Sequence, residues 1–143
     1  LSKAILKTDK NTKKIFSGVY ARDERPSKPS YPSCFIVNTH PRSKQGEHWL
    51  AFFYDSNGFC DFFDSYGQPP SSYKLKTYIT KTSKGWRYYS RRLQGHSDFC
   101  GIYAILFLLF KTIKKVDEFF REFYFNYSKN DEKIFKTFKL FLK

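Results

Sequence analysis

The sequence lacks methionine, is poor in acidic residues and contains no long apolar run, and these absences limit what the protein can be. The longest apolar segment, Gly101 to Phe110, ends at Lys111 and is too short to span a bilayer. Residues 1–15 are rich in lysine and have no apolar centre, so they do not resemble a signal peptide. We therefore expect no membrane partner. Because the chain begins at Leu1 and contains no Met, we also expect an excised or processed segment.

Cysteine and histidine are scarce as well. The chain has three of each, at Cys34, Cys60, Cys100, His40, His48 and His96. The cysteines form no Cys-x-x-Cys pair and, being odd in number, cannot all be disulfide-bonded. Neither residue type shows the spacing of zinc ligands. We therefore expect no metal and a reducing compartment.

Acidic residues are outnumbered two to one, with 13 Asp and Glu against 26 Lys and Arg. No acid lies between Gly67 and Ser97, where basic residues alternate with Tyr and Trp. The basic residues of this segment are Lys74, Lys76, Lys81, Lys84, Arg87, Arg91 and Arg92. Such a surface is typical of proteins that follow a phosphate backbone and stack on bases, so DNA is a candidate partner. A solvated, highly charged surface is an equally good interpretation.

The length of 143 residues indicates one domain, residues 1–143. We also expect a monomer. Residues 1–30 are expected to form a basic, partly irregular N-terminal arm with one short apolar element, Ile15 to Tyr20. Strands are expected at Cys34–Asn38, His48–Tyr54, Phe59–Asp64 and Trp86–Tyr89, with Tyr73–Thr80 ambiguous between helix and strand. Asn57-Gly58 predicts a hairpin between the second and third of these strands.

The chain is expected to be helical from Cys100 onward, which makes the fold class α+β. In residues 116–143, apolar residues recur at helical spacing opposite charged ones. The two stripes are Val116, Phe119, Phe120, Phe123, Tyr124 and Tyr127, then Ile134, Phe135, Phe138, Phe141 and Leu142. Aromatic stripes of this kind are more often core than ligand site, so we predict C-terminal amphipathic helices.

Cys100 is the candidate nucleophile. It stands at the start of the apolar helix, where the positive end of the helix dipole favours a thiolate. Cys34 and Cys60 lie within apolar strands and are better interpreted as buried, unreactive thiols. A cysteine at a helix start is typical of cysteine hydrolases, which need a base close by.

His48 is the candidate base because it stands at the entrance of a strand, where its ring is able to face a helix terminus. Asp64, at the end of the next strand, is the candidate acid that orients it. His40 and His96 are weaker bases, the latter too close to Cys100 along the chain. Asp55 and Asp61 are weaker candidates for this acid. Asp55 borders a turn, and Asp61 should face away from the site if the strand alternates.

Gln94 precedes Cys100 by six residues and is the candidate side-chain donor to an oxyanion, with the backbone N–H of Cys100 as the second donor. Trp49, next to His48, is expected to form the wall of the substrate cleft and to stack on the imidazole. A plain core tryptophan is the alternative interpretation.

Several segments resemble adenovirus maturation proteases of the adenain type and, more distantly, the Ulp-type SUMO proteases. They are Gly18–Tyr20, Ile36–Thr39, Gly46–Phe52, Cys60–Gly67 and Leu93–Tyr103. The resemblance covers roughly residues 16 to 110 in the order of that family. It implies His48 as base, Asp64 as orienting acid, Gln94 as oxyanion donor and Cys100 as nucleophile. It also implies a papain-like fold in permuted order, with a central mixed sheet packed against the nucleophile helix.

The resemblance implies a cysteine endopeptidase that cleaves after Gly in small-residue motifs and matures viral or virus-like capsid precursors. An origin in an adenovirus-related or Maverick-type element and a location in the virion and the host nucleus or cytoplasm follow from it. It also implies an activating peptide or DNA as the only cofactors. Here the acid is Asp where adenoviral proteases have Glu, and the C-terminal part matches poorly. A protease of ubiquitin-like modifiers and a nucleic-acid-binding scaffold without turnover are the alternatives.

Overall fold

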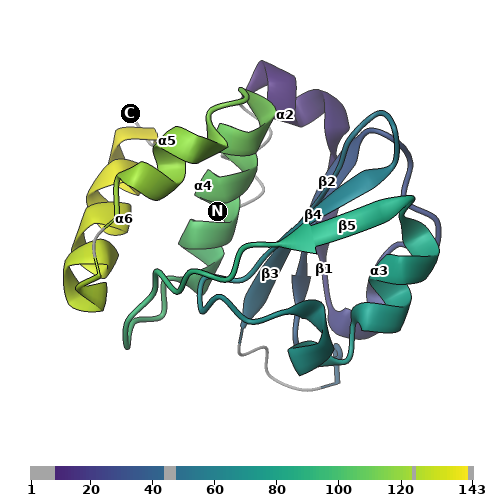
Figure 1. Cartoon of the computed structure of the whole chain (residues 1–143), viewed down its shortest axis with the longest axis horizontal. Coiled ribbons are helices and arrows are strands. Elements are labelled where there is room, and N and C mark those ends of the chain that lie inside the picture. The colour runs from purple at the N-terminus through teal and green to yellow at the C-terminus, as the bar shows by residue number, and fades with distance from the viewer. Residues whose placement is uncertain (1–8, 44–47, 124, 142–143) are drawn as a thin grey trace.

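A five-stranded mixed β-sheet forms the centre of the protein, with helices on both faces (Figure 1). The computed structural model describes residues 9–43, 48–123 and 125–141. The strands are β1 (Phe16–Tyr20), β2 (Ser33–Asn38), β3 (Trp49–Tyr54), β4 (Phe59–Phe63) and β5 (Gly85–Tyr88), in that spatial order. The two outer pairs are parallel and the two inner pairs antiparallel. The predicted α+β class with a mixed sheet is confirmed.

The helices of the described residues divide between the two faces of the sheet. They are α2 (Lys10–Ile15), α3 (Lys76–Thr82), α4 (Cys100–Thr112), α5 (Val116–Arg121) and α6 (Tyr127–Phe141), with short 3-10 helices η1 (Arg22–Glu24) and η2 (Pro70–Tyr73). In Figure 1, α3 covers one face, whereas α4 covers the other and carries α5 and α6 outside it. The sheet is therefore the middle layer.

Alternation along the strands explains why both faces are covered. In β2, Cys34 and Ile36 pack with α4, while Phe35 and Val37 pack with Leu75 and other residues on the α3 side. Every residue of β2 is buried, as expected for a central strand that is apolar on both faces. The helix α4 is apolar nearly all round because the sheet lies on one side of it and α5 and α6 on the other.

The predicted hairpin between β3 and β4 is confirmed. The carboxylate of Asp55 accepts the backbone N–H groups of Asn57 and Phe59, both at 2.9 Å. Gly58 has a φ of 86°, a left-handed conformation that glycine adopts without strain. Asp55 therefore serves the turn.

Three expectations need correction. The arm of residues 1–30 is more regular than predicted in its described part, because it contains α2 and the edge strand β1. The ambiguous Tyr73–Thr80 segment is mainly α3, preceded by η2. The first aromatic stripe spans two helices, and its Tyr124 lies outside the described residues. The helix α5 ends at Arg121, and the Arg91 guanidinium binds the carbonyls of Phe120 and Phe123 there, at 2.8 and 2.5 Å.

Candidate active site

His48 stands immediately before β3, at the edge of the sheet that faces the start of α4. Its backbone oxygen accepts the N–H of Thr39 at 2.9 Å, which holds this end of β3 beside β2. Its Nε2 atom lies 2.5 Å from Oδ1 of Asp64, and Cys100 is close enough to contribute to the raised pKa of His48. The structure thus brings the predicted base, acid and nucleophile together.

Asp64 follows the last residue of β4 and is only 1% exposed. Besides His48, it accepts the backbone N–H groups of Tyr66 at 3.0 Å and Gln68 at 3.1 Å, and the hydroxyl of Tyr73. A buried carboxylate needs such donors, because an unpaired charge is strongly disfavoured away from water. This arrangement keeps Asp64 ionised and fixes its orientation.

The pKa values of His48 and Asp64 are shifted in opposite directions. Burial lowers the pKa of His48, but the hydrogen bonds and charges of Asp64 and Cys100 outweigh it and raise that pKa to about 9. Burial raises the pKa of Asp64, yet the hydrogen bonds from His48 and Tyr73 and the histidine charge hold it below its usual value. Near neutral pH the site therefore contains an imidazolium and a carboxylate, and that imidazolium stands beside the Cys100 sulfur.

Cys100 is the first residue of α4 and is 6% exposed. No side chain caps this helix, so its first backbone N–H groups have no capping acceptor. Cys34 and Cys60 are free thiols with no exposed surface. Burial raises the pKa of Cys34 to about 12 and that of Cys60 further, which agrees with their interpretation as unreactive core residues.

Gln94 is buried and held on both sides of its side-chain amide. Its Oε1 accepts the hydroxyl of Ser65, and its Nε2 donates to the carbonyl of Ser97 at 2.7 Å. The carbonyl of Ser65 also accepts the backbone N–H groups of Leu93 and Gln94, at 2.8 and 3.0 Å. Consecutive residues of one turn, Asp64 and Ser65, therefore orient His48 and Gln94. Because an amide nitrogen has two hydrogens, Gln94 has one more to donate.

Trp49 does not stack on the His48 imidazole, contrary to the prediction. The ring stacked on His48 is that of Tyr66, with centroids 4.8 Å apart and planes at 24°. Trp49 is half-buried and lies against the helix start instead, where a Cβ built on Gly101 would be 3.4 Å from its Cδ1. Alternation explains this, since Trp49 shares the α4 face of β3 with Ala51. Trp49 also lines a pocket of about 210 Å³ together with Asn38 and His40.

The residues that were weaker candidates for the base or the orienting acid lie away from His48 or have other partners. His96 and Asp98 are exposed on the loop before α4, and His40 lines the pocket beside Trp49. Asp61 was expected to face away from the site, and it lies on the α4 side of the sheet. There it binds Nε of Arg87 and Nζ of Lys111, the latter at 2.6 Å. None of these contacts involves the His48 imidazole.

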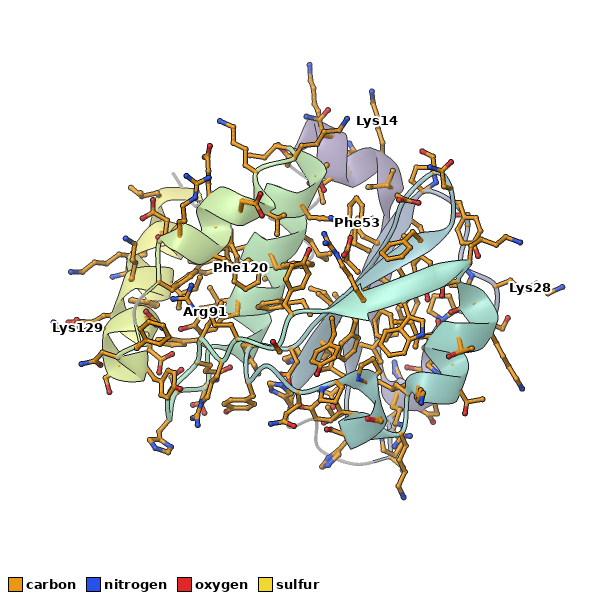
Figure 2. All side chains as sticks on the ribbon, in the orientation of Figure 1. Lys14, Lys28, Phe53, Arg91, Phe120 and Lys129 are labelled. Atoms are coloured by element: carbon orange, nitrogen blue, oxygen red, sulfur yellow. The ribbon has the colours of Figure 1, made fainter. Side chains whose placement is uncertain are left out.

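The basic segment divides into two parts. Lys74, Lys76, Lys81 and Lys84 are exposed around α3. The three arginines have structural partners: Arg87 binds Asp61, Arg91 binds carbonyls at the end of α5, and Arg92 donates to the carbonyl of Gln94 at 2.7 Å. Figure 2 shows Arg91 beside Phe120, and Lys14, Lys28 and Lys129 at separate edges of the molecule. Positive charge is thus distributed around the protein.

Sequence reasoning missed three residues that contact the site: Ser65, Tyr66 and Tyr73. The first two follow Asp64 directly, so their place in the turn was a usable signal. This turn closes with a hydrogen bond from the N–H of Gly67 to the carbonyl of Asp64 at 2.8 Å, and Gly67 has a φ of 74°. Tyr73 is brought to Asp64 by η2, an element that the sequence pattern did not predict.

Within the described residues, no cluster of His, Cys, Asp and Glu is suited to a metal ion. In the same part of the chain, no helix has the length and apolar character needed to cross a membrane. A scan against protein-family models gives no match, and a search of curated proteins gives none either.

Proposed function

We propose that this protein is a cysteine endopeptidase with a papain-like fold of the adenain and Ulp type. The observation that carries the proposal is the position of His48, whose Nε2 hydrogen-bonds Asp64 and whose imidazole lies close enough to Cys100 for that side chain to raise the pKa of His48. This is the arrangement of nucleophile, base and orienting acid that acyl transfer requires. The start of α4 at Cys100 and its packing on the sheet are consistent with that fold.

In the proposed reaction, the Cys100 thiolate attacks the carbonyl carbon of the scissile peptide bond. A C–S bond forms and the carbonyl oxygen becomes an oxyanion. The C–N bond then breaks as His48 gives its proton to the leaving amine, which yields a thioester. Water attacks the thioester while His48 takes one of its protons, and the acid product and the thiolate are released. Asp64 holds the ring orientation through both steps.

Gln94 and the backbone N–H of Cys100 are the proposed donors to the oxyanion. Two features support this: Gln94 is fixed by Ser65 and Ser97, and Cys100 is at the uncapped start of a helix. Donors that are held in place before the reaction stabilise developing charge without reorganisation. Loss of one such donor typically lowers the rate on the order of 10²- to 10³-fold.

The proposed substrate is a polypeptide cleaved after glycine, such as a viral or virus-like capsid precursor. The indole of Trp49 lies against Gly101, next to the nucleophile, and we propose that it narrows the approach of the substrate to the sulfur. Exclusion of a single methyl group corresponds to about 10- to 200-fold in specificity. A peptide library varied before the cleavage point tests this, since equal cleavage after Gly, Ala and Leu would contradict it. Trp49→Ala should broaden acceptance.

Removal of ubiquitin-like modifiers is the second candidate, because the acid is Asp64 and Ser65 follows it, a pair that suits the Ulp branch. A thiol-reactive probe with a ubiquitin-like tail, tested beside a capsid-derived peptide, separates the two substrates. Labelling or cleavage that disappears in Cys100→Ala but persists in Cys34→Ala supports the peptidase. Absence of both in the wild-type protein would leave a scaffold without turnover.

DNA remains a proposed partner, supported by the net charge of +13 and by four exposed lysines around α3. The arginines of the same segment support it less, because they bind protein groups. DNA or an activating peptide would act as a cofactor, as the resemblance implies. Titration of binding against salt concentration tests the DNA contact.

A further inference from the structure

The loop of residues 92–99 carries Gln94 and leads into Cys100, so its placement determines where the proposed oxyanion donors lie. On one side it is held by the turn after β4, through the backbone bonds of Leu93 and Gln94 to Ser65. These bonds fix the two residues at the beginning of the loop. The next residue, Gly95, has its backbone N–H directed toward a different element.

That element is α6, which belongs to the C-terminal part where the resemblance is poor. The N–H of Gly95 lies 3.1 Å from both carboxylate oxygens of Asp131, and the hydroxyl of Tyr103 donates to the same carboxylate at 2.8 Å. The neighbouring Asn130 donates its Nδ2 to the carbonyl of Leu93 at 3.0 Å. Asp131 is only 8% exposed. One buried carboxylate thus connects the loop to the nucleophile helix.

The contact between α6 and the loop is close along its length. A Cβ built on Gly95 would lie 2.8 Å from Oδ2 of Asp131, so only glycine fits there without displacement. The Arg92 guanidinium lies 4.6 Å from the ring centroid of Tyr127 in the first turn of α6. Further along, Phe99 stacks on Phe135 with centroids 5.3 Å apart. The loop is therefore held by α6 before, at and after Gly95.

We propose that Asp131 is a positioning residue for the oxyanion donor Gln94; it acts through Gly95 and is itself held by Tyr103. This inference rests on the proposed peptidase function and adds α6 to the parts of the chain that the reaction requires. His48 and Asp64 are held by other contacts, so loss of Asp131 leaves that pair in place. It displaces Gln94 relative to the Cys100 sulfur.

The test compares two reactions of Cys100 in Asp131→Asn. Alkylation by iodoacetamide forms an S–C bond and expels iodide, so it needs the thiolate but no oxyanion donor. Peptide cleavage needs both. We expect kcat for the peptide to fall about 10- to 100-fold, while the alkylation rate stays within about twofold of wild type and KM changes little. Asp98→Asn, an exposed acid in the same loop, is the matched control and should alter neither reaction.

Equal losses in both reactions, or no loss in peptide cleavage, would overturn the proposal. Tyr103→Phe removes one donor to Asp131 without placing an amide in the core, and should give the same selective loss to a smaller degree. Failure of the peptidase function is distinguishable, because the wild-type protein would then cleave nothing. In that case amide hydrogen exchange still decides: Gly95 should exchange at least about 10-fold faster in Asp131→Asn, and an unchanged rate would exclude the contact.

Discussion

Two buried aspartates, Asp61 within β4 and Asp64 just after it, have partners of different kinds. Asp61 is 4% exposed and binds Arg87 and Lys111. Asp64 binds His48. Arginine and lysine keep their charge throughout the neutral range, whereas histidine loses or gains a proton there. The partner of a buried carboxylate, rather than its burial, therefore determines whether it can assist proton transfer.

The fold explains why the partners differ. Asp61 lies within β4, where the register of the parallel pair sets Arg87 of β5 beside it. Asp64 lies one residue beyond the end of β4, where its backbone leaves the sheet and turns toward His48. The helix α4 lies near both aspartates. It begins with Cys100 near Asp64, and Lys111 in its last turn binds Asp61. The candidate reaction site, at the end of β4 and the start of α4, is therefore separate from a structural ion pair at the middle of β4 and the end of α4.

The largest effects are expected when the carboxylate of Asp64 or Asp61 is replaced by an amide. Asp64→Asn should lower the peptide cleavage rate on the order of 10³- to 10⁴-fold, because the amide no longer stabilises the imidazolium or fixes its ring. Asp61→Asn should leave that rate within a few-fold of wild type, but lower the free energy of unfolding by about 3 kcal/mol, because Lys111 loses its carboxylate in a mostly buried place.

Rate measurements with a glycine-containing peptide and urea denaturation check this pair. The expected result is a crossed pattern, with the large rate effect at Asp64 and the larger stability effect at Asp61. A strong loss of rate in Asp61→Asn, in protein that remains folded, would mean that the two aspartates are not separate in function.

The dependence of stability on pH is the next effect in size. The pKa of His48 is raised from 6.5 to about 9, so the folded protein binds a proton there that the unfolded chain releases. The corresponding stabilisation, about 3 kcal/mol, is fully present below pH 6.5 and is lost as pH rises through 9. Denaturation at several pH values should show this loss in the wild type and in Asp61→Asn, but not in His48→Ala. An equal loss in His48→Ala would assign it to other groups.

Much of the sheet could be predicted from the sequence because its strands have strong local signals. Apolar runs separated by Asn57-Gly58 and by proline-rich segments identified β2, β3 and β4 within one residue at each end. The contact between His48 and Asp64 could be anticipated because His48 directly precedes β3 and Asp64 directly follows β4, the two strands of one hairpin. Local pattern and tertiary structure agree in these segments.

The remainder depends on contacts between distant residues, which no local pattern encodes. The stripe from Val116 to Tyr127 is continuous in the sequence, but Arg91 binds the carbonyls that end α5. The Arg87 charge looked uncompensated because its partner, Asp61, belongs to another strand. Asp131 reaches Gly95 across 36 residues, and Trp49 packs on Gly101 rather than on its neighbour His48.

A tyrosine beside each aspartate allows a milder test of the same comparison. Tyr73 donates its hydroxyl to Asp64, and Tyr89 donates to Asp61 at 3.4 Å. Tyr73→Phe removes one of the donors that orient Asp64, so peptide cleavage should slow by about 3- to 10-fold, in line with about 1 kcal/mol for one hydrogen bond. Tyr89→Phe should leave the rate unchanged. Equal rates in both variants would show that Asp64 does not need its tyrosine.

The smallest expected effect is on DNA binding, and it compares the exposed lysines of α3 with Arg87, which binds Asp61. Arg87 is committed to Asp61, whereas Lys76 and Lys81 are exposed on α3, so only the lysines should release counterions from a phosphate backbone. Replacing both lysines with Gln should flatten the log–log dependence of DNA affinity on salt by about 0.9 per lost contact. Arg87→Gln should leave that slope unchanged and cost about 1 kcal/mol of stability, since the pair is half open to solvent. A flattened slope in Arg87→Gln, with none in the lysine variant, would assign phosphate binding to Arg87 and remove the distinction between structural and free cations.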